Sequence, residues 1–499
     1  MTEITALKIR YVYNLVIRVV KDIFENEGVP KLQVWFEYSL KERKMKALRI
    51  MSIVAICLFF AETAMAANYY IRGGATGTNS GSDWNNAYTS LPATLIRGSV
   101  YYIAGGSYPA YTFDDAESGT TLITVKKATA SDHGTDTGWD SSYGTTQAVF
   151  NSIIRFNTGY YVFDGQTRNE SDWFNGDAYG IRISHNNNDQ NIVIVASNIS
   201  IKYVYINAIY GDAASSTCDF ASTTCRRYAI DTDTYGEGTN TGLLFHRMYV
   251  YGSNNIWFIR ETNGTIIEYS ASDGAHGNGP NHAGIVNLYF NANNSITRYC
   301  KFRNAFTLGS GGGTALWCIT RCGSTGLCGS SNGGHQIYGN EVAHYCTTDG
   351  IIGYIGSDSI NNKVYNNTFI DGTGKSANCW GAGISLPSSG NVAHNNLWVG
   401  WQSGRLSMDT SHDYNAFSGS SNFSEAHGQA NIPTSIFSNY SGNNFRLASA
   451  SSAGTSLSST YNYDLLGSLR GSDGTWDRGA YEFGGNNTPL IRPNPPILH

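Results

Sequence analysis

The sequence predicts an all-β protein whose main part is a right-handed parallel β-helix, a single elongated domain in which the chain winds into stacked coils. Short strand-like segments recur, like residues fall into columns when these segments are aligned, and the composition is polar but weakly charged. Only 14% of the 499 residues are charged, whereas 41% are hydrophobic. Repeat architectures lengthen by adding coils rather than further cores, so a chain of this length fits one solenoid.

Four segments of the chain align without gaps: 296–302, 336–342, 363–369 and 392–398. Parallel strands about 4.8 Å apart bring equivalent residues of successive coils into contact. We therefore expect one column of hydrogen-bonded amides at a turn, because an amide both donates and accepts, and one inward column of large apolar residues. The turn column holds Cys300, Asn340, Asn367 and Asn396, and the inward column holds Phe302, Val342, Phe369 and Trp398.

Charged residues support the same register. The alignment places Glu268 beside Arg298, and Lys301 beside Glu341. The longest step between coils, from residue 300 to residue 340, contains a Gly- and Cys-rich insertion, 309–334. We expect this insertion to stand outside the coil as a wall.

The two ends of the solenoid need covers, because an open coil exposes apolar interior and strand edges. Spaced apolar residues in 83–96 predict a short N-terminal capping helix, although Pro92 interrupts the pattern. At the other end the β-helix, 67–484, gives way to a Gly-, Asn- and Pro-rich tail, 485–499, with the composition of a linker.

Residues 45–66 predict a secretory signal peptide. A basic start precedes an apolar run from Ile50 to Phe60, and Ala64-Met65-Ala66 offers a cleavage site. The apolar run is about half the ~20 residues that span a bilayer, and a signal anchor is the alternative. Residues 1–44 are basic and aliphatic, so we interpret Met45 as the true start and 1–44 as a non-native extension. The mature protein is then secreted or at the cell surface.

The charge of the mature chain argues against a nucleic-acid partner. Without residues 1–66 it has 23 basic and 31 acidic residues, a net charge of −8. Proteins that bind nucleic acid instead present a basic patch to the phosphates.

Eight cysteines follow residue 66, an even number that suits disulfides in an exported chain. The register predicts a Cys346–Cys379 bond, because each cysteine lies five residues before an aligned Ile, and Cys218 and Cys225 flank a short loop. The others could form two bonds in one of three pairings, or the last three could bind zinc together with His335. These others are Cys300, Cys318, Cys322 and Cys328.

Several short motifs occur in a characteristic order: 68–84 at the opening, the strand with Gly-x-Tyr at 97–108, and 161–165, 413–417 and 476–483 further on. In this order they resemble the right-handed parallel β-helix proteins of the pectate-lyase-like superfamily. The resemblance covers about 68–484 and implies a fold, with a link to carbohydrate by analogy. The Arg-x-Pro-x-x-Arg of the main pectate lyases and the Gly-His-Gly of the polygalacturonases do not occur.

A predicted loop at 271–282 carries the richest set of candidate catalytic groups, Asp273, His276 and His282. His344 and Asp349 follow on the next related loop. A carboxylate and an imidazole on neighbouring coils could act as general base and acid in a polysaccharide lyase, with Ca²⁺ or a basic side chain neutralising a uronate carboxylate. Asp273 and Asp349 are the pair that a glycoside hydrolase would use. The alternative is that these are turn residues bonded to their own backbone.

Lys375, Trp380 and Trp401 are expected to contact a sugar polymer, whereas Trp398 is expected to lie in the core. Two functions follow for a groove on the flank of the helix. One is a lyase or hydrolase that acts on polysaccharide. The other is a non-catalytic surface or matrix protein that binds glycans or acts as an adhesin. In both cases the partner is a polysaccharide or glycan, without a membrane span after the signal peptide is removed.

Overall fold

The computed structural model describes residues 67–484 with internal gaps at 185–189, 209–227, 233–237, 254, 279–283, 290, 309–314, 321–331, 348–349, 356–358, 372–382 and 401–409. The chain divides into two compact units, Met1–Ala64 and Met65–His499, and every described residue belongs to the second. The predictions for residues 1–66 and for the tail 485–499 lie outside the described residues. Among the described residues, no helix has the length and apolar character that crossing a membrane requires.

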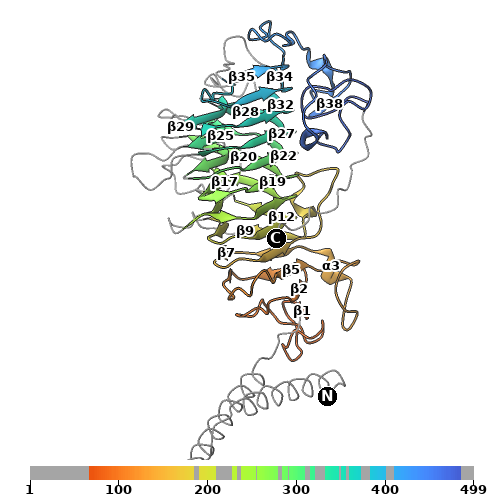
Figure 1. Ribbon diagram of the computed structural model, residues 1–499. Helices are drawn as coiled ribbons and strands as arrows, with labels where there is room; N and C mark the ends of the chain where they lie inside the picture. Colours follow the sequence, from red (N-terminus) through yellow and green to blue (C-terminus); the bar gives the residue numbers. More distant parts are fainter. Residues whose placement is uncertain are drawn as a thin grey trace, which may run out of the picture. The chain divides into compact units, whose positions relative to one another are not determined.

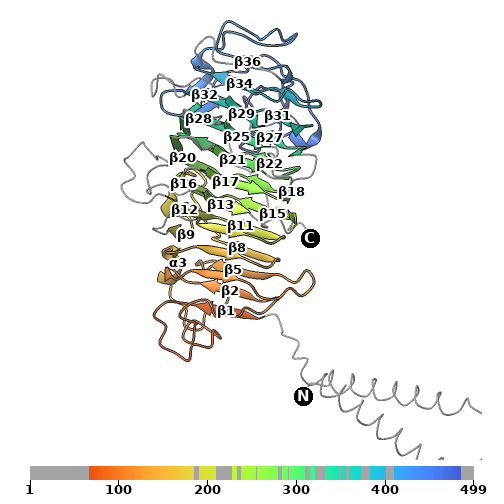
Figure 2. The ribbon, with the colours of Figure 1, turned by 90° about the vertical axis from the view of Figure 1, so that its left-hand side faces the viewer.

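The chain is a right-handed parallel β-helix, as predicted. Three long parallel sheets, here called A, B and C, run along the stack, and successive coils add one strand after another to them (Figures 1 and 2). Sheet A contains β1 (Asn68–Ile71), β2 (Val100–Ile103), β5 (Ile123–Lys127), β8 (Tyr161–Asp164), β11 (Ile199–Lys202), β15 (Leu243–His246), β19 (Ile266–Glu268), β22 (Ile296–Arg298), β27 (Gln336–Tyr338), β31 (Lys363–Tyr365), β33 (Val392–His394) and β35 (Ser411–Asp413).

From β2 to β29 (Gly350–Ile355) the chain passes in each coil from sheet A to sheet B and then to sheet C. Sheet B contains β3 (Gly106–Tyr108), β6 (Ala148–Phe150), β9 (Ile181–Ser184), β12 (Val204–Asn207), β16 (Tyr249–Ser253), β20 (Ala271–Asn278), β23 (Lys301–Arg303), β28 (Glu341–Thr347), β32 (Thr368–Asp371), β34 (Leu397–Val399) and β36 (Ala416–Phe417), with β24 (Phe306–Leu308) paired to β20 and β28. Sheet C contains β4 (Tyr111–Phe113), β7 (Ile154–Phe156), β10 (Ile192–Ile194), β13 (Tyr228–Thr232), β17 (Asn255–Arg260), β21 (Gly284–Tyr289), β25 (Ala315–Thr320) and β29 (Gly350–Ile355).

Smaller elements lie outside these sheets. Two short parallel pairs accompany the coils, and one antiparallel hairpin lies near the C-terminal end. They are β14 (Asn240–Thr241) with β18 (Thr262–Asn263), β26 (Asn332–Gly333) with β30 (Ser359–Ile360), and β37 (Phe437–Asn439) with β38 (Asn444–Leu447). The helical turns are α3 (Ser142–Thr145), η1 (Gly176–Ala178), η2 (Thr434–Ile436) and η3 (Ser459–Tyr461).

The corner between sheets A and B is sharp because one residue in the left-handed conformation turns the chain there. Tyr269 has φ 50° and Asn366 has φ 55° at this position. A left-handed residue reverses the local twist of the strand and redirects the backbone within a single step. The same position in other coils is occupied by Tyr203, Arg247, Tyr299, Gly339, Asn395 and Tyr414.

The predicted inward column is confirmed. Phe302, Val342, Phe369 and Trp398 are register partners on successive strands of sheet B, and all are buried. The rings of Phe369 and Trp398 have centroids 5.0 Å apart. Stacking of like residues along the axis therefore builds the core, and Trp398 belongs to it as expected.

The predicted amide ladder is also confirmed. Asn340 Nδ2 donates to Asn367 Oδ1 at 2.9 Å, and Asn367 Nδ2 donates to Asn396 Oδ1 at 2.9 Å. Asn415 continues the ladder by one coil, and Glu425 ends it by accepting from Asn415 Nδ2 at 2.7 Å. Each amide also bonds backbone groups of the neighbouring coil, so the ladder pairs polar groups that would otherwise be buried unsatisfied.

Cys300 is a correction to the predicted disulfides. It is a free, fully buried cysteine at the first position of the amide ladder, where its backbone N–H donates to Asn340 Oδ1 at 2.9 Å. Burial raises the pKa of its thiol. A side chain enclosed at this corner has no second cysteine beside it among the described residues, so the proposed two further bonds cannot include it.

His335 belongs to a second ladder, which the sequence did not reveal. Its backbone N–H donates to Asn362 Oδ1 at 2.9 Å, and Asn362 Nδ2 donates to Asn391 Oδ1 at 2.9 Å. His335 Nδ1 accepts from the Ser295 N–H at 3.2 Å, and burial lowers the pKa of the imidazole to about 3. His335 is thus a neutral residue of this ladder, and the side chains of Cys318, Cys322 and Cys328, which would complete the alternative zinc site, lie outside the described residues.

The predicted capping helix in 83–96 is wrong, although the segment does cover the first coil. The Asp83 carboxylate accepts the Asn85 and Asn86 N–H groups, both at 2.9 Å, and so fixes a tight turn. Tyr88 then forms an isolated parallel bridge with Ile71. Trp84 and Leu95 are nevertheless buried, so an irregular segment performs the capping role.

The insertion 309–334 is likewise not entirely a wall. Its residues Ala315–Thr320 form β25, which pairs with β21 and β29 in sheet C. Trp317 is fully buried in the interior. This part of the insertion continues the coil, and 309–314 and 321–331 lie outside the described residues.

Candidate functional site

The expected catalytic loop at 271–282 is mostly a strand, which corrects the prediction. Residues 271–278 form β20, whose Asp273 is the register partner of Tyr251 and Arg303 in sheet B. His276 lies in the same strand, beside Phe306 of β24. Sheet pairing on both sides extends the backbone at Asp273, and Gly274 follows in the left-handed conformation with φ 82°.

Most of the other predicted site residues lie outside the described part of the chain. Cys346 lies in β28, in register with Phe306 of β24, but its expected partner Cys379 is not described. The residues outside the described part are Cys218, Cys225, His282, Asp349, Lys375, Trp380 and Trp401.

Asp273 is tied to the next coil by both of its carboxylate oxygens. Oδ2 accepts from Arg303 Nε at 2.9 Å, and Oδ1 accepts from Asn304 Nδ2 at 2.7 Å. The side chain of Asp273 is 12% exposed and that of Arg303 is 35% exposed. Asp273 thus serves first as the counter-ion that orients Arg303 on the outer face of sheet B.

His344 lies in β28 with φ 56°, where the register with β32 is irregular. Its Nε2 is 2.6 Å from Asn443 Oδ1, at the tip of the β37–β38 hairpin. β23 lies between β20 and β28, so Asp273 and His344 are two coils, about 10 Å, apart. The structure does not bring these two predicted catalytic residues into contact.

A long connection between β8 and β9, residues 165–180, brings aromatic side chains to the same face; we call it the β8–β9 segment. Two glycines allow it to leave and rejoin the coil tightly. A Cβ at Gly165 would lie 2.0 Å from the Tyr203 carbonyl oxygen, and one at Gly180 would lie 1.9 Å from the Gly165 carbonyl oxygen. Only glycine fits at such distances from backbone atoms.

The β8–β9 segment meets β23 through contacts between cations and aromatic rings. The Lys301 ammonium lies 5.1 Å from the centre of the Trp173 ring, and Arg168 lies 4.0 Å from that ring. The Arg303 guanidinium lies 3.6 Å from the centre of the Phe174 ring. Because Lys301 and Arg303 are two residues apart on one strand, both project from the outer face of sheet B.

The same face is closed further along the stack. Ala343, Ile370 and Val399 follow Arg303 in the outward column and are buried beneath the chain after β36, residues 418–484, here called the closing segment. The partly exposed residues between the two covers form what we call the sheet-B site. They are Phe174, Tyr251, Lys301, Arg303 and Asn304.

A buried cluster of charges lies beneath the β8–β9 segment at the corner of sheets A and B. His246 Nδ1 is 2.8 Å from Glu268 Oε1, and Glu268 Oε2 accepts from Arg298 Nε at 2.7 Å. The predicted Glu268–Arg298 pair is thus confirmed. Burial opposes the ionisation of Glu268, but the hydrogen bond from His246 and the charge of Arg298 lower its pKa below the usual value.

Sequence reasoning missed His246 as part of this cluster. The available signal was the position just before the corner residue in each strand of sheet A, where charged and titratable residues succeed one another. In order along the stack these are Lys126, Asp164, Lys202, His246, Glu268 and Arg298.

No group of three or more His, Cys, Asp or Glu side chains suited to a metal ion occurs among the residues that the structure describes. In the sheet-B site region both oxygens of the Asp273 carboxylate are engaged by Arg303 and Asn304. The described geometry therefore provides no Ca²⁺ ligand set, since Ca²⁺ takes six to eight oxygen ligands.

No family model and no curated protein matches this chain. Solved structures that resemble it include pectate lyase Pel9A, with 14% identity and a TM-score of 0.42 over 84% of this chain and 98% of that chain. A PL6 family polysaccharide lyase from Pseudopedobacter saltans is 12% identical, with a TM-score of 0.29 over 64% of this chain and 60% of that chain. A variant of the PL6 family alginate lyase AlyGC is 10% identical, with a TM-score of 0.31 over 68% and 51%. The strand register, and not these scores, defines the fold.

Proposed function

We propose that the protein binds an anionic polysaccharide at the sheet-B site. The observation that carries the proposal is the arrangement of Lys301 and Arg303 on one strand, each against an aromatic ring of the β8–β9 segment. Cationic side chains pair with the carboxylates of a uronate polymer, and aromatic rings pack against the apolar faces of sugar rings. Lys301 has no carboxylate partner among the described residues, so its charge is available to a ligand.

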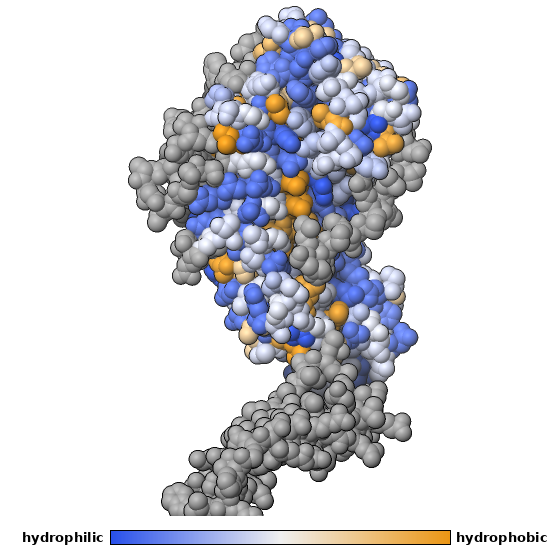
Figure 3. Space-filling view, viewed as in Figure 1, coloured by the Kyte–Doolittle hydropathy of each residue, from blue (hydrophilic) through white to orange (hydrophobic). Residues whose placement is uncertain are grey.

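The character of the surface suits a polar ligand. Figure 3 shows a mainly hydrophilic face, on which hydrophobic residues form a narrow stripe along the stack and a few small separate patches. Protein partners and membranes are recognised through broader apolar patches. A sugar polymer instead needs polar groups with a few aromatic contacts, and the sheet-B site supplies both.

The geometry favours binding over catalysis. A general base must reach a substrate proton, and Asp273 is a largely buried counter-ion held by Arg303 and Asn304. A lyase or hydrolase acting here is the second candidate. It is favoured by the presence on β20 of the Asp273 carboxylate, whose side chain is 12% exposed, beside the Arg303 guanidinium on β23.

The test is a binding measurement with matched variants. The protein should bind polygalacturonate or alginate more tightly than a neutral polymer such as galactan, and salt should weaken the binding. Lys301→Ala should weaken it by about 10-fold, the effect of one charge-assisted hydrogen bond. Lys363→Ala is the control, because Lys363 is exposed on the outer face of sheet A.

Equal losses in the two variants, or equal affinity for charged and neutral polymers, would contradict the proposal. The same samples distinguish binding from catalysis. A rise in absorbance from unsaturated sugars, or new reducing ends, would establish the second candidate. Its loss in Asp273→Asn would assign the base.

We further propose that the protein acts outside the cytoplasm, as a secreted or cell-surface protein. The signal-peptide pattern at 45–66 and the low content of charged residues support this location. N-terminal sequencing of the natural mature protein should begin at Ala67. Peptides from residues 1–44 in that material would contradict both the cleavage and the interpretation of Met45 as the start.

A further inference from the structure

The β8–β9 segment joins two regions of different chemistry. Near its start, Arg168 donates to the Tyr269 carbonyl oxygen and, at 2.8 Å, to Glu170 Oε2. Glu170 also lies 3.2 Å from Arg247 at the corner. A few residues later the same segment places Trp173 against Lys301 in the sheet-B site. The contacts of Glu170 with Arg168 and Arg247 therefore also help to hold Trp173, one wall of the sheet-B site.

A buried imidazole lies under this attachment. His246 is 1% exposed, and its Nδ1 is paired with Glu268. Its buried Nε2 has no hydrogen-bond partner among the described residues. A neutral imidazole tolerates this arrangement, because an unprotonated Nε2 only forgoes an acceptor bond. A protonated one would bury an N–H without a partner.

The surroundings of His246 are already rich in cations. Charged and titratable groups reach the imidazole from both neighbouring strands, from the corner and from the β8–β9 segment. The charged and titratable groups that face or adjoin it are Lys202, Tyr203, Arg247, Glu268 and Tyr269 directly, with Arg168, Glu170, Arg298 and Asp164 next to these. Four of them are cations and three are carboxylates, so one more positive charge would lack a counter-ion.

We propose that the β8–β9 segment is a movable wall of the sheet-B site and that protonation of His246 opens it. The inference rests on the proposed function, because it concerns the regulation of that same surface. Opening hydrates the imidazolium and releases Glu170 from Arg247. It also withdraws Trp173 and Phe174 from Lys301 and Arg303, so the glycan site loses its aromatic wall.

The direction of the pH dependence follows from proton linkage. Burial, with the charges of Arg247 and Lys202, lowers the pKa of His246 despite its bond to Glu268. The closed state thus binds fewer protons than the open state, in which the imidazole titrates near its usual value of about 6.5. Closure is fully stable above that pH and weakens as the pH falls below it.

Two of the three carboxylates, Glu170 and Glu268, do not interfere in this range, whereas burial raises the pKa of the third, Asp164, which adjoins Lys202. Burial opposes ionisation of Glu170, but its bonds to Arg168 lower its pKa, and the pKa of Glu268 is also lowered. Both therefore stay ionised while His246 titrates. Titration of His246 alone changes the ratio of open to closed states at most about 10-fold per pH unit.

Hydrogen exchange of the protein tests the inference without any glycan. Backbone amides of residues 169–178 should exchange at least about 5-fold faster at pH 5 than at pH 7.5, after correction for intrinsic rates. His246→Gln should remove this difference, because an amide stays neutral at both pH values. His427→Gln should leave it intact, since the His427 side chain is 54% exposed and lies at the other end of the stack.

Glu170→Gln provides a second route to the same answer. It removes the carboxylate between Arg168 and Arg247, so residues 169–178 should exchange faster at both pH values. A pH effect that persists in His246→Gln, or no pH effect in the unaltered protein, would overturn the inference. Binding of polygalacturonate at pH 7.5 is measured separately. Its absence would remove the proposed function while leaving the pH-dependent opening in place.

Discussion

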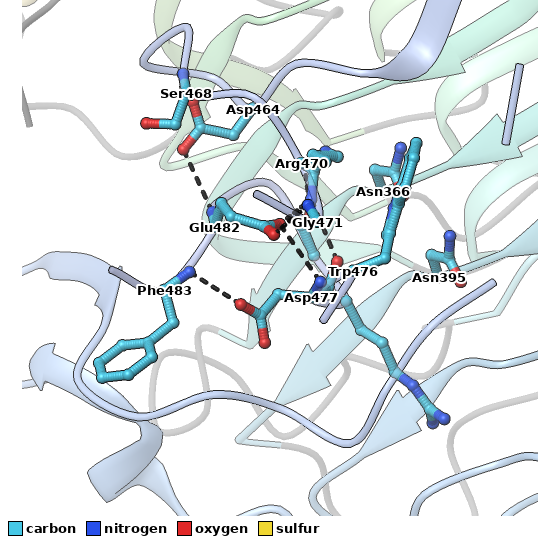
Figure 4. A network of polar contacts seen from close by, with 12 residues as sticks. Asn366, Asn395, Asp464, Ser468, Arg470, Gly471, Trp476, Asp477, Glu482 and Phe483 are labelled. Carbon is cyan, nitrogen blue, oxygen red and sulfur yellow. Dashed lines mark hydrogen bonds and ion pairs between the residues drawn. The ribbon is translucent and has the colours of Figure 1, made fainter. Parts of the chain in front are cut away.

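The corner of the solenoid and the closing segment pair backbone N–H groups with different side chains. At the corner, Asn367 and Asn396 accept the N–H groups of the preceding amide-ladder residues at 3.0 Å. In the closing segment carboxylates do this. Glu482 Oε1 accepts from the Gly471 N–H at 2.6 Å, and Asp477 Oδ2 accepts from the Phe483 N–H at 2.8 Å (Figure 4).

The two groups differ in whether they can pass a chain of hydrogen bonds on to the next coil. An amide both donates and accepts, so Asn can pass hydrogen bonds from coil to coil without limit. A carboxylate only accepts, so it ends a chain of donors, as Glu425 does at the end of the amide ladder. The amide is also neutral at every pH. A buried carboxylate, by contrast, must carry its negative charge without the hydration that stabilises that charge in water. Burial accordingly raises the pKa of Glu482 to about 7.

The largest effect should come from breaking the amide ladder in its middle. Asn367→Ala removes bonds to Asn340 and Asn396 and to the Ile337 carbonyl oxygen, leaving buried donors and acceptors unsatisfied. We expect the free energy of unfolding in urea to fall by about 3 to 5 kcal/mol, independently of pH. Asn444→Ala on the exposed hairpin is the control and should cost less than about 0.5 kcal/mol. Similar costs at the two positions would show that the ladder does not stabilise the stack.

The closing segment should instead show a pH dependence that the ladder lacks. The pKa of Glu482 is raised in the folded protein, so this carboxyl contributes stability that is present below its unfolded value near 4.5 and lost as the pH rises through about 7. We expect the fall in unfolding free energy between pH 5 and pH 8 to be smaller in Glu482→Gln by about 2 kcal/mol. Asp114→Asn, an exposed acid, should retain the full pH dependence. A Glu482→Gln protein as sensitive to pH as the unaltered one would assign the effect elsewhere.

The smallest effect on the free energy of unfolding should appear at Glu425, where the amide ladder ends on a carboxylate. Glu425 accepts from the Asn415 N–H, from Asn415 Nδ2 and from His412 Nδ1, all within 2.8 Å. Glu425→Gln keeps one acceptor oxygen but turns an amide NH₂ toward these donors, so we expect a loss of about 1 to 2 kcal/mol. Denaturation at pH 7 measures it. A stabilised variant would mean that the ladder can end on an amide.

The sequence predicted the solenoid well because its register is a local property. With one coil placed, the spacing of the repeats fixes the neighbours of Asn367, Phe369 and Glu268 in the next coil, and the structure confirms all three columns. The predictions were wrong where pairing with other segments changes the local backbone conformation. Asp273 was placed in a loop because Asp-Gly favours turns, but pairing with β16 and β23 extends it.

The candidate site was less predictable, because its two sides come from different parts of the chain. Lys301 and Arg303 were visible as strand residues, but the rings of Trp173 and Phe174 that face them lie more than a hundred residues earlier. No repeat relates the β8–β9 segment to β23. The partner of His344, Asn443, is similarly remote, and it reaches β28 only because the closing segment folds back along the stack.

By itself the sequence determined the coil, the inward column and the amide ladder, because parallel strands repeat the same contact at every step. Tertiary structure alone decided which outward-facing residues are covered, which carboxylates are buried and where cations meet aromatic rings. The physical reason is that these depend on excursions of the chain, whose paths are set by packing across many coils rather than by the spacing between neighbouring ones.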